Sequence, residues 1–250
     1  MNVRLVALLA ALLPFVAVNR TYLVAASHGL VDWCFPYLDS CTSISATGRK
    51  PPASYLFRAT MLPSAVIMMA YWWLNHAWLG AVGQRVGDPC RRLNNWMLGL
   101  GILACIGLVL YVTVLGEAGA AWARQRRIGT VLCFSFTYIS QLLLLAQLRH
   151  LQEQLPPLPS FLFPVMWGSC ILLLLLGLLT VALDAWDEAW YETVEDAFEW
   201  MLTLVQQANF LLGYLVWKAV GWGLEVRTME AGAAGRADNA EPELKDTELK

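Results

Sequence analysis

The chain alternates between long apolar runs and short polar connectors along most of its length. A run of about 20 apolar residues is long enough to cross the hydrocarbon core of a bilayer as one helix. The run around 171–176 is the clearest because it is almost pure leucine, whereas Asn19 and Arg20 interrupt the first run. We assign six membrane-spanning helices, at residues 5–26, 57–79, 95–115, 128–148, 161–183 and 197–220.

This pattern predicts an all-α fold, a polytopic transmembrane bundle of six helices that occupies residues 1–222. The segment 223–250 is polar and almost free of large apolar residues, so we expect it to be disordered. Six crossings also place the connectors 27–56, 116–127 and 184–196 on one face of the membrane. The identity of that face stays open, because Lys and Arg are shared almost evenly between the two sides.

The composition agrees with a membrane protein and excludes several other classes. Of the 250 residues, 58% are hydrophobic and 14% are charged, and the mean hydropathy is +0.52. Soluble domains are roughly a quarter charged. The net charge of −2 gives no sign of a nucleic-acid partner. We therefore expect an integral, multi-pass protein, of the plasma or inner membrane in a prokaryote and of an endomembrane in a eukaryote.

The six cysteines show no spacing typical of a zinc or thioredoxin-type site, and we predict neither a metal nor a cofactor. Cys34 and Cys41 share the first connector, and they can form a disulfide bond if this connector faces an oxidising compartment. The sequence contains neither a serine-hydrolase elbow nor a metalloprotease motif. Enzymatic activity stays open, but the sequence favours its absence because no nucleophile–base pair is visible.

An acidic stretch precedes the main part of the sixth span. Seven carboxylates and no basic residue lie between Asp184 and Glu199, interleaved with aromatic side chains. We interpret this stretch as a solvated outer surface at headgroup level. Partial pairing with the basic connectors of the same face, and a divalent cation site, are alternatives that rank below this interpretation.

The first connector combines hydroxyl groups, a glycine and two adjacent cations, a mixture that can hold a phosphate or a lipid headgroup. A turn-rich connector whose cations reach toward headgroups is an equally good interpretation. Polar residues at the starts of the second and sixth spans can complete a site, and Arg58 and Glu199 can pair there. The hypothetical headgroup site consists of Ser43, Ser45, Thr47, Gly48, Arg49, Lys50, Arg58 and Glu199.

Short motifs in the same regions resemble a known family. The motifs, in chain order, are Pro36-Tyr37, Ser43-Ile44-Ser45-Ala46-Thr47-Gly48, Pro51-Pro52 leading into Phe57-Arg58, and Phe198-Glu199-Trp200. This order resembles the Frag/DRAM/Sfk family of six-span membrane proteins. The resemblance implies a role in membrane-lipid handling, such as lipid remodelling or lipid asymmetry, and it implies no shared catalytic constellation.

The sequence therefore predicts an integral membrane protein of the Frag/DRAM/Sfk type that binds or organises membrane lipids. The alternative is a non-enzymatic scaffold or adaptor for a partner membrane protein, because small residues on the third span can pack against another helix. These small residues are Gly99, Gly101, Cys105 and Gly107. A transporter is disfavoured, since the sequence shows no inverted repeat and no broken helix pair.

Overall fold

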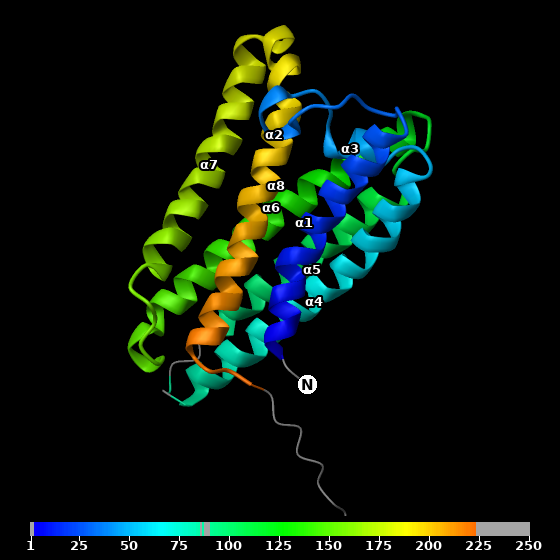
Figure 1. Ribbon diagram of the computed structural model, residues 1–250. Coiled ribbons are helices and arrows are strands. Elements are labelled where there is room, and N and C mark those ends of the chain that lie inside the picture. The colour runs from blue at the N-terminus through cyan, green and yellow to red at the C-terminus, as the bar shows by residue number, and fades with distance from the viewer. Residues whose placement is uncertain (1–2, 86, 88–90, 224–250) are drawn as a thin grey trace, which may run out of the picture.

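The computed structural model describes residues 3–85, 87 and 91–223, and within them every regular element is helical. Six long helices form a bundle (Figure 1). They are α1 (Val3–Ser27), α4 (Ala53–Arg85), α5 (Arg91–Thr113), α6 (Ala120–His150), α7 (Leu162–Trp186) and α8 (Glu188–Ala219). Short helices in the connectors are α2 (Pro36–Asp39), α3 (Ile44–Thr47) and the 3-10 turn η1 (Gln152–Gln154). The predicted disordered segment 223–250 lies outside the described residues, apart from Gly223.

Five of the long helices, α1, α4, α5, α6 and α7, are long and apolar enough to cross a membrane. The 32-residue helix α8 is more polar, because it begins in the acidic stretch and carries several amides farther along. Two of these amides, Gln206 and Asn209, are buried against neighbouring helices, as expected for polar groups that must avoid lipid. The structure confirms the predicted class, an all-α transmembrane bundle.

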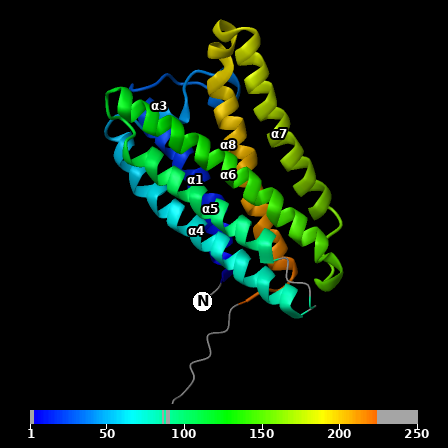
Figure 2. The same cartoon turned by 180° about the vertical axis from the view of Figure 1, so that it is seen from behind.

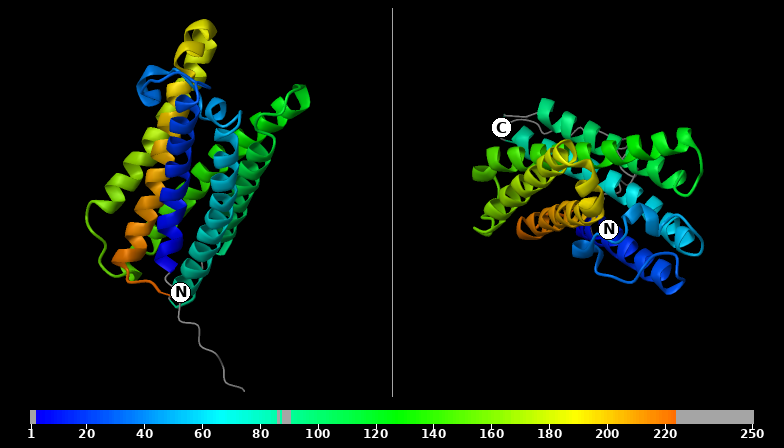
Figure 3. Two further views of the ribbon diagram at one scale, coloured as in Figure 1. Left: turned by 45° about the vertical axis from the view of Figure 1, so that its right-hand side comes forward. Right: turned by 90° about the horizontal axis from the view of Figure 1, so that it is seen from above.

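The helices that contact each other follow the order α7, α8, α1, α4, α5 and α6 around the bundle. Helices α6 and α7 meet near the connector that joins them and diverge toward the opposite end, as Figures 1 and 2 show. The two further views in Figure 3 show the same separation. That opposite end, which we call the upper end, carries α2, α3, the α5–α6 connector and the α7–α8 connector, whereas α1 begins at the lower end.

Helix α1 continues through a proline because a side chain of α8 binds the carbonyl group that the proline leaves unpaired. Pro14 has no N–H to donate to the carbonyl oxygen of Ala10. With its amide nitrogen turned toward α1, Gln207 donates to the carbonyl oxygens of Ala10 (3.2 Å) and Ala11 (3.3 Å). This amide therefore fixes α8 against α1.

Small residues of α5 pack against neighbouring helices of the same chain. A Cβ atom at Gly101 would overlap the ring of Trp72 on α4, and one at Gly107 would lie 2.9 Å from the carbonyl oxygen of Gly129 on α6. Cys105 is buried as well, whereas Gly99 faces open space. Most of the small residues that the scaffold alternative assigned to a partner helix are therefore used within the bundle.

Large aromatic side chains join the lower half of α8 to α4. The ring of Tyr71 stacks on Trp217 with centroids 5.3 Å apart and lies edge-on to Phe210 at 5.0 Å. The indole N–H of Trp217 donates to Oδ1 of Asn75 (3.1 Å), which satisfies the polar part of this buried side chain. This cluster fixes α8 in the bundle and so positions its upper half, where the candidate site lies.

Candidate functional site

A disulfide bond closes a loop within the first connector, and an indole hydrogen bond holds the connector against α8. Cys34 and Cys41 are linked, and α2 lies in the loop that they close. The indole N–H of Trp200 on α8 donates to the carbonyl oxygen of Thr42 (2.8 Å). The ring of Tyr37 packs on Trp200 with centroids 5.1 Å apart. The connector is thus a fixed cap over the upper end rather than a loose loop.

The short helix α3 and the residues that flank it present polar groups to one side. Ser43 caps α3 by accepting a hydrogen bond from the backbone N–H of Ala46 (3.0 Å). The hydroxyl oxygens of Ser43 and Ser45 are 3.1 Å apart. The guanidinium of Arg49 donates to the Ser45 hydroxyl (2.9 Å), a bond that uses only one of its N–H donors. Arg49 is therefore oriented by α3 and retains donor groups for a ligand.

An open groove at the upper end lies between α3, α6, α7 and α8. We call it the outer groove, and its volume is about 590 Å³. It is lined by Ser43, Ser45, Arg49, Thr130, Val131, Phe134, Ser135, Thr180, Val181, Tyr191, Glu195, Asp196, Phe198, Glu199 and Leu202. The structure thus brings together four of the residues that the sequence singled out, Ser43, Ser45, Arg49 and Glu199, from segments far apart in the chain.

Carboxylates outnumber the cation in the outer groove. Glu195, Asp196 and Glu199 line it together with Arg49. Within the part of the chain that the structure describes, Arg49 contacts Ser45 and forms no ion pair with these carboxylates. Burial raises the pKa of Asp196 above its ordinary value, and the nearby Glu195 adds to this rise while Arg49 opposes it. Acidic side chains therefore outnumber basic ones in the lining of the outer groove.

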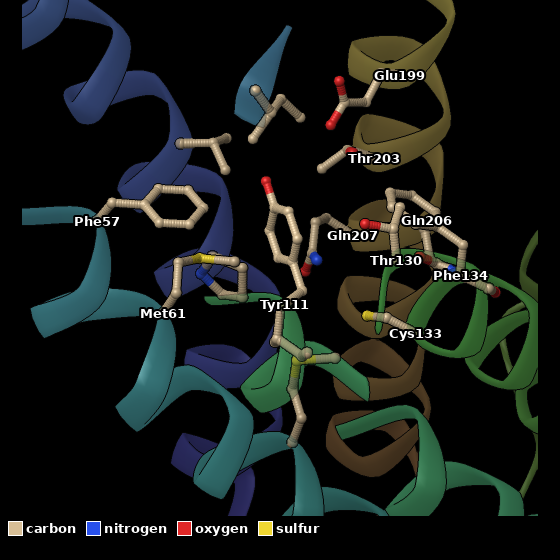
Figure 4. Close-up of a pocket in the computed structure, with 15 residues that line it drawn as sticks. Phe57, Met61, Tyr111, Thr130, Cys133, Phe134, Glu199, Thr203, Gln206 and Gln207 are labelled. Atoms are coloured by element: carbon tan, nitrogen blue, oxygen red, sulfur yellow. The ribbon is translucent and has the colours of Figure 1, made fainter. Parts of the chain in front are cut away.

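A smaller, more enclosed pocket adjoins the outer groove and shares Thr130, Phe134 and Glu199 with it. We call it the inner pocket; its volume of about 60 Å³ has room for a small polar group. Figure 4 shows the Tyr111 hydroxyl directed into the upper part of this pocket, beside which Glu199 and Thr203 of α8 lie.

Two of the hydroxyl groups that line the inner pocket have no hydrogen-bond partner within the described residues. Tyr111 is only 8% exposed, and neither its hydroxyl nor that of Thr203 has a hydrogen-bond partner among the described residues. Buried polar side-chain atoms in native proteins are almost always hydrogen-bonded. The inner pocket is therefore a place where a polar group from outside the chain would be stabilised.

An apolar groove continues from the outer groove along the gap between α6 and α7. It shares Phe134, Ser135 and Leu202 with the outer groove and has a volume of about 210 Å³. Its remaining lining residues are Tyr138, Leu173, Leu174, Gly177, Leu178 and Gln206. Because α6 and α7 diverge toward the upper end, a polar compartment there leads into an apolar compartment at membrane depth.

Two of the predicted site residues have structural roles beside α3. Thr47 is fully buried, and its hydroxyl donates to the carbonyl oxygen of Ile44 (2.7 Å). Gly48 packs so closely that a Cβ atom there would lie 2.8 Å from Leu115. Neither residue lines the outer groove.

The two other cations of the predicted site also lie outside the outer groove. Arg58 donates to the carbonyl oxygen of Leu115 at the end of α5, so it ties α4 to α5 and does not pair with Glu199 in the described residues. Lys50 is exposed and does not line the groove. Of the three predicted cations, only Arg49 faces the site.

Several residues of the site were not singled out from the sequence. Tyr111 and Thr203 are single polar residues within apolar runs. Such residues are costly to place in lipid, but the sequence does not show that these two lie in the same pocket. Glu195 and Asp196 belong to the acidic stretch that we interpreted as a solvated surface, yet they line the outer groove. They lie four and three residues before Glu199, a spacing that places all three side chains on one face of a helix. This spacing is the sequence signal by which they could have been added to the site.

The comparison with protein families agrees with this architecture. The family model described as the Frag1/DRAM/Sfk1/Cwh43P N-terminal domain matches residues 2–215, a range that contains every residue of the outer groove and the inner pocket. No curated protein and no solved structure matches the chain. The family match covers most of the 250 residues and includes the motifs around α3 and at the start of the sixth span. The protein therefore belongs to the Frag1/DRAM/Sfk1/Cwh43P N-terminal domain family of membrane proteins.

Proposed function

We propose that this multi-pass membrane protein binds a phospholipid at the upper end of the bundle, with the headgroup in the outer groove and an acyl chain in the apolar groove. The observation that carries the proposal is the continuity of the two compartments through Phe134, Ser135 and Leu202. A phospholipid has the same succession of a charged head and an apolar chain. Bound in this way, one lipid would be held for organisation or remodelling at the membrane surface.

The phosphate of the headgroup would bind beside α3. Arg49 supplies N–H donors, and Ser43 and Ser45 supply hydroxyl groups on the same wall of the outer groove. Guanidinium groups bind phosphate oxygens through charge-assisted hydrogen bonds, which are stronger than bonds between neutral groups. The lipid would displace or share the bond between Arg49 and Ser45.

The disulfide bond supports an assignment of the leaflet that supplies the lipid. Disulfides persist in oxidising compartments, and Cys34–Cys41 lies in the cap at the upper end. We therefore infer that the upper end faces the cell exterior or an organelle lumen. The headgroup would then come from the exoplasmic leaflet.

Quantification by mass spectrometry of the phospholipid retained through purification tests the headgroup site. Arg49→Ala removes the charge-assisted bonds to phosphate, worth about 1.5 kcal/mol, and should lower the retained phospholipid by about tenfold. Lys50→Ala is the matched control, because it removes the neighbouring cation that does not line the groove. Equal retention by both variants and the unmodified protein would contradict the proposal.

The apolar groove is tested separately on α7. Gly177 lines this groove and Gly168 does not, and a Cβ atom would meet open space at either position. Gly177→Phe should fill the groove and reduce the retained phospholipid, whereas Gly168→Phe should leave retention unchanged. A loss of equal size in both variants would assign the effect to general disturbance of α7 rather than to the groove.

A further inference from the structure

We infer that the bound lipid carries a primary ammonium group, as a phosphatidylethanolamine-type headgroup does, and that Glu199, Tyr111 and Thr203 hold this group. This inference rests on the proposed function and adds the chemical class of the headgroup. It assigns separate places to the two charges of the ligand. The phosphate lies at Arg49, and the ammonium enters the inner pocket beside Glu199.

The charges of the outer groove favour a headgroup that contains a cation. Three carboxylates, Glu195, Asp196 and Glu199, share the lining with the single cation Arg49. An anionic headgroup would satisfy Arg49 but would lie against these three acidic side chains, which repel an anion when they are ionised. A zwitterionic headgroup satisfies both signs, because its phosphate and its ammonium are adjacent and can contact Arg49 and the carboxylates at the same time.

The inner pocket favours a primary ammonium over a quaternary one. The unpaired hydroxyl oxygens of Tyr111 and Thr203 and the carboxylate of Glu199 line this small pocket. A primary ammonium has N–H donors on every side and no acceptor, as in the lysine side chain. It can therefore donate to all three oxygens. A quaternary ammonium has no N–H to donate and is recognised instead over aromatic faces.

A metal ion is a poorer occupant of this site. Within the described residues, no group of three or more His, Cys, Asp or Glu side chains is arranged to hold a metal ion. Calcium requires an oxygen-rich shell of several ligands. An organic ammonium needs only the three oxygens that the inner pocket offers, so it fits the geometry better.

Competition between lipids that differ only in the headgroup tests the inference. The full-length protein in detergent is mixed with equal amounts of phosphatidylethanolamine, phosphatidylcholine and phosphatidylglycerol with identical acyl chains, in the presence of a metal chelator. Native mass spectrometry then measures the occupancy of each lipid. We expect phosphatidylethanolamine to exceed each of the others by about tenfold, the ratio that one charge-assisted hydrogen bond gives.

Conservative variants connect this preference to the pocket. Tyr111→Phe and Glu199→Gln keep the shape of each side chain, and each should reduce the preference for phosphatidylethanolamine at least fivefold without abolishing phospholipid binding. Glu192→Gln is the matched control, because Glu192 lies on the same helix and is exposed outside both cavities. The helical circular dichroism signal of each variant reports whether the bundle still folds.

The outcomes separate this inference from the proposed function. Phospholipid binding without preference, or equal binding of phosphatidylethanolamine and phosphatidylcholine, would overturn the primary-ammonium assignment and leave the proposed lipid site intact. In a parallel mixture with calcium in place of the chelator, a preference for phosphatidylglycerol that is absent with the chelator would overturn it in favour of a metal bridge. Absence of all lipid binding, or binding indifferent to Arg49→Ala, would overturn the proposed function itself.

Discussion

The hydroxyl groups of segment 43–48 serve the folding of the cap before they can serve a ligand. Thr47 donates to Ile44 inside the cap, and Ser43 caps α3 while it also lines the outer groove. Composition alone gives all hydroxyls of the segment equal weight as ligand groups. Local hydrogen bonds between side chain and backbone decide which of them remain available, and only the structure shows those bonds.

Asp196 is a residue whose charge opposes folding of the ligand-free protein. Because burial and Glu195 raise its pKa, the folded state binds a proton more tightly than the unfolded state. Its penalty is therefore absent below the unfolded pKa of 3.8 and grows as the pH rises through the raised pKa. We expect Asp196→Asn to raise the stability at neutral pH by up to about 1 kcal/mol, a limit set by solvent screening of a partly exposed group.

Thermal unfolding midpoints measured at neutral and mildly acidic pH check this expectation for Asp196. The advantage of Asp196→Asn over the unmodified protein should shrink on acidification. Glu192→Gln removes one negative charge from the exposed side of the same helix, so it should give little change. A gain from Glu192→Gln equal to that from Asp196→Asn would assign the effect to total charge rather than to the environment of Asp196.

At the scale of helices, the apolar runs predict where the long helices lie but not where they end. The predicted span 57–79 lies inside α4, which extends from Ala53 to Arg85, and 128–148 lies inside α6, which extends from Ala120 to His150. The hydrocarbon core requires only the central apolar part of each helix. Backbone hydrogen bonds continue beyond the core, so hydropathy marks the crossing and not the helix termini.

The partners of each helix were not predictable either. The glycines of α5 indicate close packing, but the sequence does not say whether the partner is α4, α6 or another protein. Gly101 faces Trp72 on α4, while Gly107 faces Gly129 on α6. The two glycines thus serve two different helix pairs. Assigning each glycine to its partner helix requires knowledge of how α5 is rotated in the bundle.

Two alanine substitutions on α5 should have opposite effects on stability. A Cβ atom at Gly107 would lie 2.8–2.9 Å from atoms of α6 that include backbone groups of Cys133 and Gly129. We expect Gly107→Ala to destabilise the protein by about 2 kcal/mol, a typical cost of overpacking. Gly99 meets open space, so Gly99→Ala should stabilise the helix by up to about 1 kcal/mol. Thermal unfolding in the same detergent measures both, and a similar loss in both variants would contradict the packing of α5 on α6.

At the scale of the whole molecule, the sequence predicted the connectors that meet but only part of the site that they form. Ser43, Ser45, Arg49 and Glu199 come together in the outer groove, because an even number of crossings returns the first and fifth connectors to one end. The inner pocket depends on the depth and rotation of α5 and α8, which place Tyr111 opposite Thr203. Such convergence of single polar residues within the bundle is a tertiary property that hydropathy and periodicity do not contain.

The topology that unites the site can be tested without a ligand. Lys50 in the first connector and Glu192 near the start of α8 are exposed at the upper end, whereas Arg149 is exposed at the end of α6 and lies at the lower end. In a chain with Cys90 replaced by serine, Lys50→Cys and Glu192→Cys should react with a membrane-impermeant maleimide added to the exterior or luminal side. Arg149→Cys should react only after the membrane is permeabilised. The free cysteines Cys105, Cys133 and Cys170 lie within the bundle helices and should contribute little background. Labelling of Lys50→Cys and Glu192→Cys from opposite sides would contradict the bundle, and labelling of both from the cytoplasmic side alone would contradict the exoplasmic assignment of the lipid site.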